Sequence, residues 1–148
     1  MKEIYFRSVV MIENLHRLFL EVLESTIQDM KIMDINSVQA LMLYNIGHDQ
    51  VAVGELTGRG YYLGSNVSYN LGKMVKNGYV NQESNPHDLR SSRVKLSAKG
   101  MELYDKLDKM FLLHGKDLVQ SGITDKEFQG IIQTLGHFEN FWIRQKNL

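Results

Sequence analysis

Apolar residues recur at intervals of three and four positions through residues 9–30. This spacing places them along one side of a helix, and it predicts an amphipathic helix of about eight turns that ends near Lys31. The predicted stripe consists of Val9, Ile12, Leu15, Phe19, Val22, Thr26, Ile27 and Met30. A second helix is predicted after Asn36 and Ser37, which can cap its first turn, and Gly47 follows its end. Its buried positions would be Val38, Leu41, Met42, Tyr44 and Ile46.

A helix-turn-helix is predicted between residues 55 and 77. Glu55 to Arg59 would form its short first helix, after a small strand at 51–53. Ser65 to Lys76 would form the longer second helix, which begins on small residues that form hydrogen bonds. The inner stripe of this helix would consist of Val67, Leu71, Met74 and Val75. Its outer faces would carry Asn66, Ser68, Tyr69, Asn70, Lys73, Lys76 and Asn77.

Two alternating segments, 79–83 and 93–97, predict a β-hairpin after Gly78. The loop between them contains a polar turn with one arginine near its tip, Asn85-Pro86-His87-Asp88-Leu89-Arg90. Such a loop, called a wing, can reach the minor groove beside a helix that enters the major groove of DNA. Helix and hairpin together therefore indicate a protein that reads duplex DNA.

Two further helices are predicted after the hairpin. The first runs from Ala98 to about Leu118. The second follows the capping box formed by Thr124 and Glu127. Their apolar and aromatic positions are Tyr104, Leu107, Phe111, His114 and Leu118 in the first helix, and Phe128, Ile131, Leu135, Phe138 and Trp142 in the second. The predicted fold class is mainly α with a small β-hairpin wing.

The helices at the two ends of the chain, 1–34 and 101–148, carry more large apolar residues than one winged helix at 35–100 can cover. We expect one domain, 1–148, in which these helices pair two chains into a homodimer. A two-fold dimer would match a pseudo-palindromic DNA site. The alternative is that the terminal helices fold back onto their own domain.

Composition excludes several functions. The chain has no cysteine, so disulfides, thiolate zinc sites and cysteine-based redox sensing are ruled out. Its single proline leaves the helical segments unbroken. No apolar run is as long as a membrane span, and the first residues lack the apolar core of a signal peptide, so we expect a cytoplasmic protein without a membrane partner.

Charge is distributed unevenly along the chain, although its formal net value is zero. Residues 59–99 contain seven basic and two acidic side chains, a balance of +5. Residues 1–58 contain four basic and eight acidic groups, and residues 100–148 contain six and seven. Attraction between charged groups and phosphates acts over about 8 Å at physiological salt, so the charge of residues 59–99 matters more than the net charge of the whole chain. This local positive charge favours a nucleic-acid partner.

The sequence contains no set of residues typical of an enzyme or a cofactor site. None of its five histidines forms a pair with metal-ligand spacing on one helical face, so no metal and no cofactor are expected. Two alternatives to a DNA-binding regulator stay open: a metal-responsive regulator, whose ligands only folding would bring together, and a winged helix that binds protein.

Residues 35–100 resemble the MarR family of bacterial winged-helix regulators. The matching segments are Glu55-Leu56, Ser65-Asn66-Val67-Ser68, Gly78-Tyr79-Val80, the wing motif Asp88-Leu89-Arg90 and Leu96-Ser97-Ala98-Lys99-Gly100. The flanking helices extend the resemblance over nearly the whole chain. The string from Gly60 to Asn66 is also similar to an alphaproteobacterial subgroup that includes regulators of cell-wall remodelling and stress.

The resemblance implies a DNA-binding role for ten residues. Arg90 would enter the minor groove, and Asp88 would hold it by a charge-assisted hydrogen bond. Ser65 would lie at the helix N-terminus. Candidates for base edges or phosphates are Asn66, Ser68, Tyr69 and Asn70, and candidates for phosphates alone are Lys73, Arg93 and Lys95. The family often has arginine at the position of Tyr69, and tyrosine cannot make the bidentate guanine contact.

The resemblance also implies a ligand-responsive repressor with a small, often aromatic, effector. The effector pocket would lie between the dimerisation helices and the DNA-binding lobe, and its candidate lining residues are His16, Leu20, Met42 and Tyr44. Each of these four residues could instead be an ordinary core or interface residue.

Overall fold

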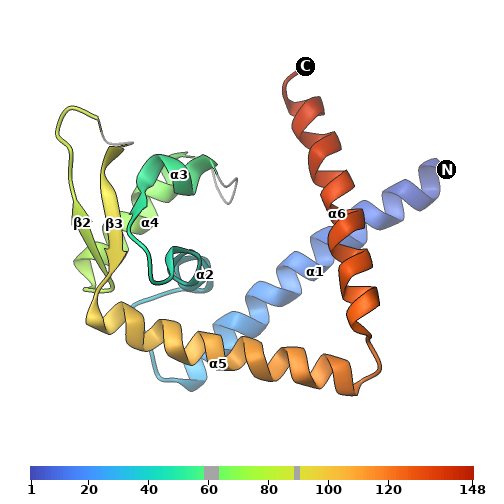
Figure 1. Ribbon diagram of the computed structural model, residues 1–148, viewed down its shortest axis with the longest axis horizontal. Helices are drawn as coiled ribbons and strands as arrows, with labels where there is room; N and C mark the ends of the chain where they lie inside the picture. Colours follow the sequence, from blue (N-terminus) through green and yellow to red (C-terminus); the bar gives the residue numbers. More distant parts are fainter. Residues whose placement is uncertain (59–63, 89–90) are drawn as a thin grey trace. The chain divides into compact units, whose positions relative to one another are not determined.

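The computed structural model describes residues 1–58, 64–88 and 91–148, with only the backbone described at 64 and 65. The predictions for Arg59 and Arg90, and for the side chain of Ser65, therefore lie outside the described residues. In chain order the elements are α1 (Lys2–Asp29), α2 (Ser37–Ile46), β1 (Val51–Ala52), α3 (Val53–Gly58), α4 (Gly64–Lys76), β2 (Val80–Glu83), β3 (Arg93–Leu96), α5 (Ala98–Gln120) and α6 (Asp125–Lys146) (Figure 1). The predicted fold class, mainly helical with a small sheet and a winged helix-turn-helix, is confirmed.

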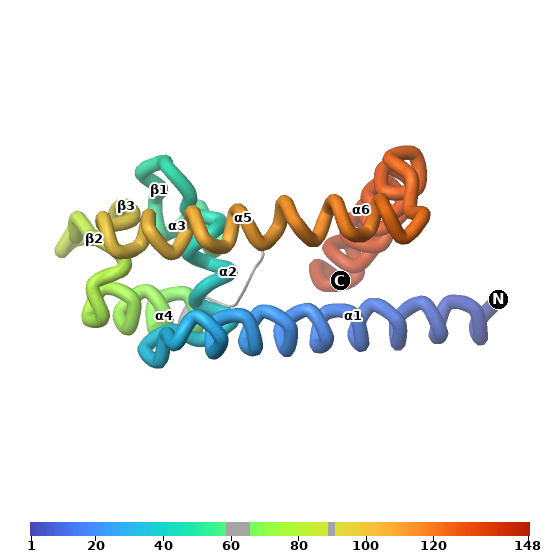
Figure 2. The backbone as a smooth tube through the Cα atoms, turned by 90° about the horizontal axis from the view of Figure 1, so that it is seen from below, coloured from blue at the N-terminus to red at the C-terminus, as the bar shows by residue number. Residues whose placement is uncertain are grey.

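The chain divides into two compact units, Met1–Lys106 and Leu107–Leu148. The first unit contains α1 to β3 and the start of α5, and α2 lies at its centre, in contact with α1, α4 and β3 (Figure 2). Its core consists of fully buried apolar side chains from every one of these elements, among them Leu23, Ile27, Leu43, Leu56, Val67, Leu71, Met74, Val80, Val94 and Leu103.

Helix α2 begins as its sequence predicts. Asn36 Oδ1 accepts a hydrogen bond from the backbone N–H of Gln39 at 2.8 Å, and Gln39 Oε1 accepts one from the backbone N–H of Asn36 at 3.2 Å. This reciprocal capping box satisfies two donors that a helix N-terminus otherwise leaves unpaired. The helix ends at Gly47, whose φ of 63° is readily adopted by glycine.

The sheet is antiparallel, with the order β1-β3-β2. In β3 the side chains of Val94 and Leu96 are buried, whereas those of Arg93 and Lys95 are exposed. This alternation confirms the predicted hairpin. Strand β1 joins it through Val51, which pairs with Val94. The sequence predicted the small strand but not its partner.

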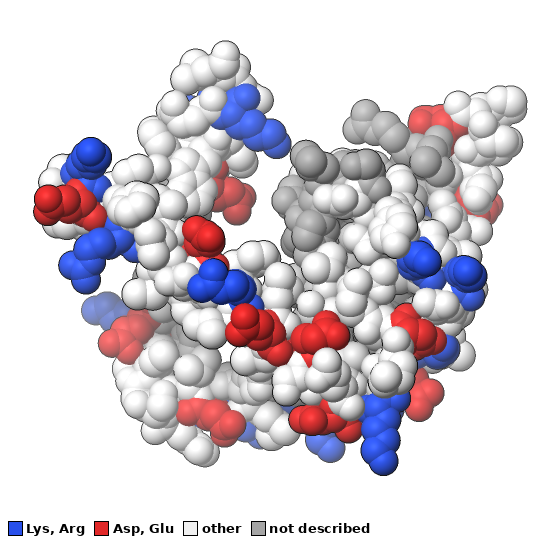
Figure 3. Space-filling model, turned by 180° about the vertical axis from the view of Figure 1, so that it is seen from behind, with Lys and Arg blue, Asp and Glu red and all other residues white. Residues whose placement is uncertain are grey.

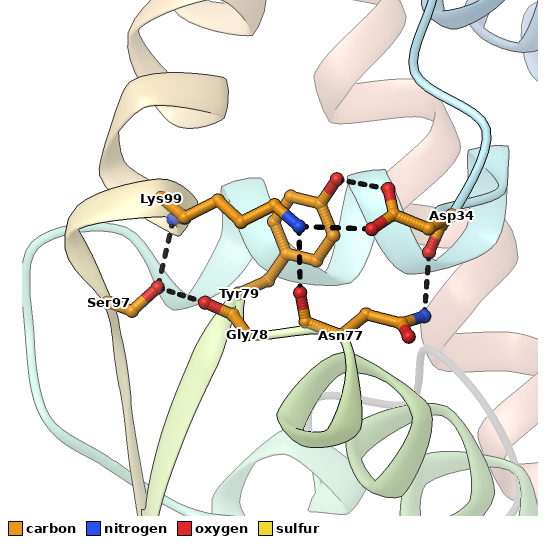
Figure 4. A network of polar contacts seen from close by, with 7 residues as sticks. Asp34, Asn77, Gly78, Tyr79, Ser97 and Lys99 are labelled. Carbon is orange, nitrogen blue, oxygen red and sulfur yellow. Dashed lines mark hydrogen bonds and ion pairs between the residues drawn. The ribbon is translucent and has the colours of Figure 1, made fainter.

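A network of polar contacts fastens three segments of the first unit together (Figure 4). Asp34 precedes α2, and its carboxylate accepts a hydrogen bond from Tyr79 Oη at 2.5 Å and pairs with Lys99 Nζ at 3.0 Å. Lys99 Nζ also donates to the carbonyl of Asn77 at 2.8 Å, and Asn77 Nδ2 donates to the carbonyl of Asp34 at 2.9 Å. Because Asn77 follows α4 and Lys99 lies in the first turn of α5, the network closes the C-terminal end of α4.

The same contacts shift two pKa values. The hydrogen bond from Tyr79 lowers the pKa of Asp34 below its ordinary value, and the contacts with Lys99 add to this effect against an opposing contribution from burial. Burial, followed by the hydrogen bond and charge of Asp34, raises the pKa of Tyr79 far above its ordinary value.

Some predicted inner and outer positions are wrong. Asn70 was placed on the outer side of α4, but it is buried, because it lies three residues after Val67 and four before Met74 on the inner stripe. Val75 is 37% exposed. In α1 the buried residues are Leu23 and Ile27; Ile27 was predicted on the inner stripe and Leu23 was not, whereas the predicted Val22 is 47% exposed.

The second unit contains the end of α5 and all of α6. Thr124 caps α6 as predicted: its Oγ1 accepts the backbone N–H of Glu127 at 3.2 Å, and Glu127 Oε2 accepts that of Thr124 at 2.9 Å. The rings of Phe138 and Trp142 meet edge to face at 5.4 Å. No residue of α6 is buried. Within the described residues, no helix is both long and apolar enough to cross a membrane.

The lowered pKa of Asp34 predicts an acid-dependent contribution to folding. The ionised carboxylate stabilises the folded state fully above its ordinary pKa, and this contribution is lost as the pH falls through the lowered folded-state value. Asp34→Asn should therefore reduce the free energy of unfolding at neutral pH, and the difference from the wild type should shrink as the pH falls to about 2.

Denaturant titrations across this pH range would measure the effect. Tyr79→Phe removes the largest cause of the shift, so Asp34→Asn introduced into that background should show a weaker pH dependence. A difference between wild type and Asp34→Asn that stays constant from neutral to acidic pH would contradict the assignment.

Candidate nucleic-acid interface

Helix α4 has two faces of opposite character. On the inner face, Val67, Leu71 and Met74 are at most 2% exposed. On the outer face, Asn66, Ser68, Tyr69 and Lys73 are all exposed. Because the inner face is buried, the outer face is fixed toward solvent, where its polar groups can meet another molecule.

An exposed aromatic ring is the most unusual feature of the outer face. Tyr69 is 64% exposed, and the ammonium group of Lys73, one turn further along α4, lies 5.8 Å from its ring centroid. Such a pair places an apolar surface, a hydroxyl and a positive charge within one turn of helix. The combination suits a DNA surface, which presents thymine methyl groups, base edges and phosphates.

Positive charge is available on two elements of the same unit. Lys73 and Lys76 are exposed on α4, and Arg93 and Lys95 are exposed on β3. Figure 3 shows Lys and Arg atoms over the part of the unit that contains α4. Exposed cations of this kind can contact phosphates, and the phosphate contacts of Lys73, Arg93 and Lys95 stay a prediction.

The base of the wing loop, residues 84–92, is tied to the rest of the unit. Ser92 is fully buried; its Oγ accepts the backbone N–H of Asn85 at 2.9 Å, and its carbonyl accepts that of Val53 at 2.8 Å. Asp88 is exposed, and its carbonyl accepts hydrogen bonds from Ser91. The predicted contact between Asp88 and Arg90 falls on a residue that is not described.

Asn70 occupies a different position from its three predicted companions on α4. It is 8% exposed; its Oδ1 accepts a hydrogen bond from Gln39 Nε2 at 3.2 Å, and its Nδ2 donates to the carbonyl of Asn66 at 2.9 Å. A side chain with these partners faces α2 and not solvent. Its position in the sequence contained the signal, because helical spacing puts residue 70 on the same stripe as 67, 71 and 74.

The four predicted effector residues do not form one site. His16 and Leu20 line a groove of about 470 Å³ along α1, together with Arg17, Ser37 and the carboxylates of Glu13, Glu21 and Glu24. Met42 is 1% exposed and belongs to the core, because α2 is covered on several sides. Tyr44 does not line the groove and stacks on Tyr104 with ring centroids 4.8 Å apart. The prediction that Met42 and Tyr44 share a pocket with His16 is therefore wrong.

Sequence reasoning missed two residues that position the site. Gln39 joins α2 to α4, and Asp34 closes the end of α4. The capping pattern at Asn36 contained a signal for Gln39 within α2, but no local pattern shows a contact across 31 residues. Among the residues that the structure describes, no three His, Asp or Glu side chains come together in a group that could hold a metal ion.

Comparison with known proteins gives this geometry a context. Residues 35–100 match a family model described as a winged helix DNA-binding domain. The chain is 31% identical over 138 residues to the exopolysaccharide II synthesis transcriptional activator ExpG of Rhizobium meliloti, covering 93% of this chain and 71% of that protein.

Solved structures share the fold. Staphylococcus aureus MarR in complex with salicylate and kanamycin is 21% identical, with a TM-score of 0.71 over 97% of this chain and 93% of that one. Streptococcus pneumoniae FabT in complex with DNA is 18% identical, with a TM-score of 0.70 over 95% and 99% of the two chains. With its buried and exposed faces of α4, its winged hairpin and these relatives, the chain belongs to the MarR family of winged-helix, DNA-binding transcriptional regulators.

Proposed function

We propose that the chain acts as a homodimeric, sequence-specific reader of duplex DNA, with α4 in the major groove and the wing loop in the adjacent minor groove. The observation that carries the proposal is the outer face of α4, where Asn66, Ser68, Tyr69 and Lys73 are exposed opposite a fully buried stripe. A helix of this width and polarity fits the major groove of B-DNA. Its family and fold are those of transcriptional regulators and not of enzymes.

The outer face of α4 limits which bases can be read. Asn66 can bond adenine through both its amide atoms, and Ser68 can donate or accept at any base edge. Tyr69 can cover a thymine methyl group or donate to a phosphate, but it cannot form the two parallel hydrogen bonds by which arginine reads guanine. We therefore propose an A·T-rich site, which would also give the predicted minor-groove contact of Arg90 a narrow, strongly negative groove.

The apolar surface of the terminal helices supports a homodimer. Large apolar side chains are more than 40% exposed on α1, on the end of α5 and on α6, among them Ile4, Phe6, Met11, Leu15, Leu18, Leu112, Val119, Ile131, Ile132, Leu135 and Phe141. Burying one such side chain contributes about 1.5–3 kcal/mol. We propose that residues 1–34 and 101–148 bury this surface against a second copy, while residues 35–100 bind DNA.

The proposed effector site is reduced to the groove along α1. Three carboxylates line it, those of Glu13, Glu21 and Glu24, against the side chains of Arg17 and His16. Aromatic anions would be repelled by this excess of negative charge, so we propose a neutral or cationic aromatic effector. Repression also stays a prediction: the Rhizobium meliloti relative bears the name of an activator.

A winged helix that binds protein would respond differently to salt. A DNA complex releases condensed counterions as lysines meet phosphates, so its affinity falls steeply with salt concentration. Lys73→Ala should weaken binding to specific and random duplexes to a similar degree and flatten the slope of log affinity against log salt by about one unit.

Fluorescence anisotropy over a salt series measures both quantities. Lys126→Ala, on α6, is the matched control and should leave the slope unchanged. A wild-type affinity for duplex DNA that does not depend on salt would contradict the proposed DNA interface.

Dimerisation can be tested on the groove of α6 that contains Ile131 and Leu135. A charge at both positions should prevent burial of this surface, so Ile131→Glu with Leu135→Glu should convert a dimer into a monomer with unchanged helix content. Gln133→Glu adds a charge elsewhere on the same exposed helix and should stay dimeric. Light scattering coupled to size-exclusion chromatography gives the mass, and a double variant that remains a dimer would contradict the proposed pairing.

A further inference from the structure

Two amide side chains in the interior of the DNA-binding unit join α2 to the DNA-facing helix. Gln39 and Asn70 are 6% and 8% exposed. Gln39 Nε2 donates to Asn70 Oδ1 at 3.2 Å, and Asn70 Nδ2 donates to the carbonyl of Asn66 at 2.9 Å. The pair therefore connects the first turn of α2 to the backbone of a residue on the outer face of α4.

The α2 end of this connection is itself held in place. Gln39 is the third residue of α2 and completes the capping box, so its Oε1 is bonded to the backbone of Asn36 while its Nε2 faces α4. The backbone N–H of Ser37 donates to Glu24 Oε2 of α1 at 2.8 Å. The amide that meets Asn70 is thus fixed relative to α1 and α2.

A directional contact is needed at this place because the rest of the interface is apolar. Val67, Leu71 and Met74 pack against the core through contacts that have no preferred direction, and these allow small rotations of α4 about its axis. Hydrogen bonds restrict both distance and angle. A rotation that separated Gln39 from Asn70 would leave a buried amide without this partner, and so it is disfavoured.

We infer that Gln39 and Asn70 form a positioning pair that sets the rotation of α4, and so determines which base edges the outward side chains meet. The inference rests on the proposed function, in which Asn66, Ser68 and Tyr69 contact DNA. Neither member of the pair touches DNA. Both act through the backbone and orientation of α4, in the way that single buried polar contacts fix the register of other helix pairs.

The test separates orientation from stability. The variants are Asn70→Leu, Gln39→Met and the two together, which replace amides by apolar groups of similar size. Two quantities are measured: the melting temperature, and the ratio of affinities for a duplex selected by the wild type and for a random duplex of equal length. Asn70→Leu alone should lower both, because it leaves the Gln39 amide without its acceptor.

The double variant gives the decisive result. It leaves neither buried amide without its partner, so the melting temperature should recover part of the loss seen in Asn70→Leu; the loss of the cap that Gln39 gives to Asn36 limits this recovery. The ratio should stay about tenfold or more below that of the wild type, because misaligned side chains lose base contacts. Binding to the random duplex and its salt dependence should not change, since the phosphate contacts remain.

Two further variants keep the test independent of folding losses. Asn70→Ser retains a hydroxyl that can bond the carbonyl of Asn66 but is too short to reach Gln39, so it should lower the ratio while keeping the fold. Ile27→Val removes one buried methyl group of α1 from the same unit and should lower the melting temperature without changing the ratio.

A wild-type ratio in the double variant or in Asn70→Ser would overturn the inference, and so would an equal loss of ratio in Ile27→Val. A wild-type protein that binds selected and random duplexes equally would overturn the proposed function itself, and the inference with it. The two failures are therefore distinguishable.

Discussion

Helix α4 can present a polar face to another molecule only if its opposite face is buried, and α2 provides the surface that buries it. Ala40 and Leu43 of α2 are completely buried, and α2 contacts α1, α4 and β3. The burial of Val67, Leu71 and Met74 then leaves Asn66, Ser68 and Tyr69 on the solvent side of α4. The exposed face of the helix is thus a consequence of the core.

Apolar packing holds α4 against the core, and polar contacts fix it at its middle and past its C-terminus. At the middle of α4, Asn70 bonds Gln39 of α2. Past its C-terminus, Asn77 and Tyr79 bond Asp34, which also pairs with Lys99 of α5. Both sets of contacts lead to the segment around the start of α2. Gly100 lets the start of α5 lie against the backbone of Tyr79, since a methyl group at position 100 would collide with the carbonyl oxygen of Tyr79.

Sequence reasoning succeeded where the signal was local. The cap at Asn36, the capping box at Thr124 and the alternation in β3 each predicted an element that the structure contains. The wrong or missing predictions had two causes. Some depended on contacts with distant parts of the chain, and one followed residue polarity where helical spacing was the better guide. The polarity of Asn70 suggested the outer face although its spacing placed it inside. The pairing of β1 with β3 joins residues about 40 positions apart in the chain, beyond the reach of a short pattern.

The exposure of the predicted site residues was foreseen in part for the same reason. Exposed residues of α4 follow from helical periodicity, and Asn66, Ser68, Tyr69 and Lys73 lie where that periodicity puts them. Grouping His16 and Leu20 with Met42 and Tyr44 required knowledge of how α1 packs on α2, which no single helix contains. Membership of a family supplied the expected pocket, but the burial of Met42 depends on the core of this chain.

The central claim is that the outer face of α4 reads base edges, and a change of specificity at Tyr69 tests it most directly. Duplexes would be selected from a random library by the wild type and by Tyr69→Arg under the same conditions. Arginine can form the bidentate guanine contact that tyrosine lacks, so the account predicts a new guanine at one position of each half-site, with the other positions unchanged. Identical selected sites for the two proteins would contradict it.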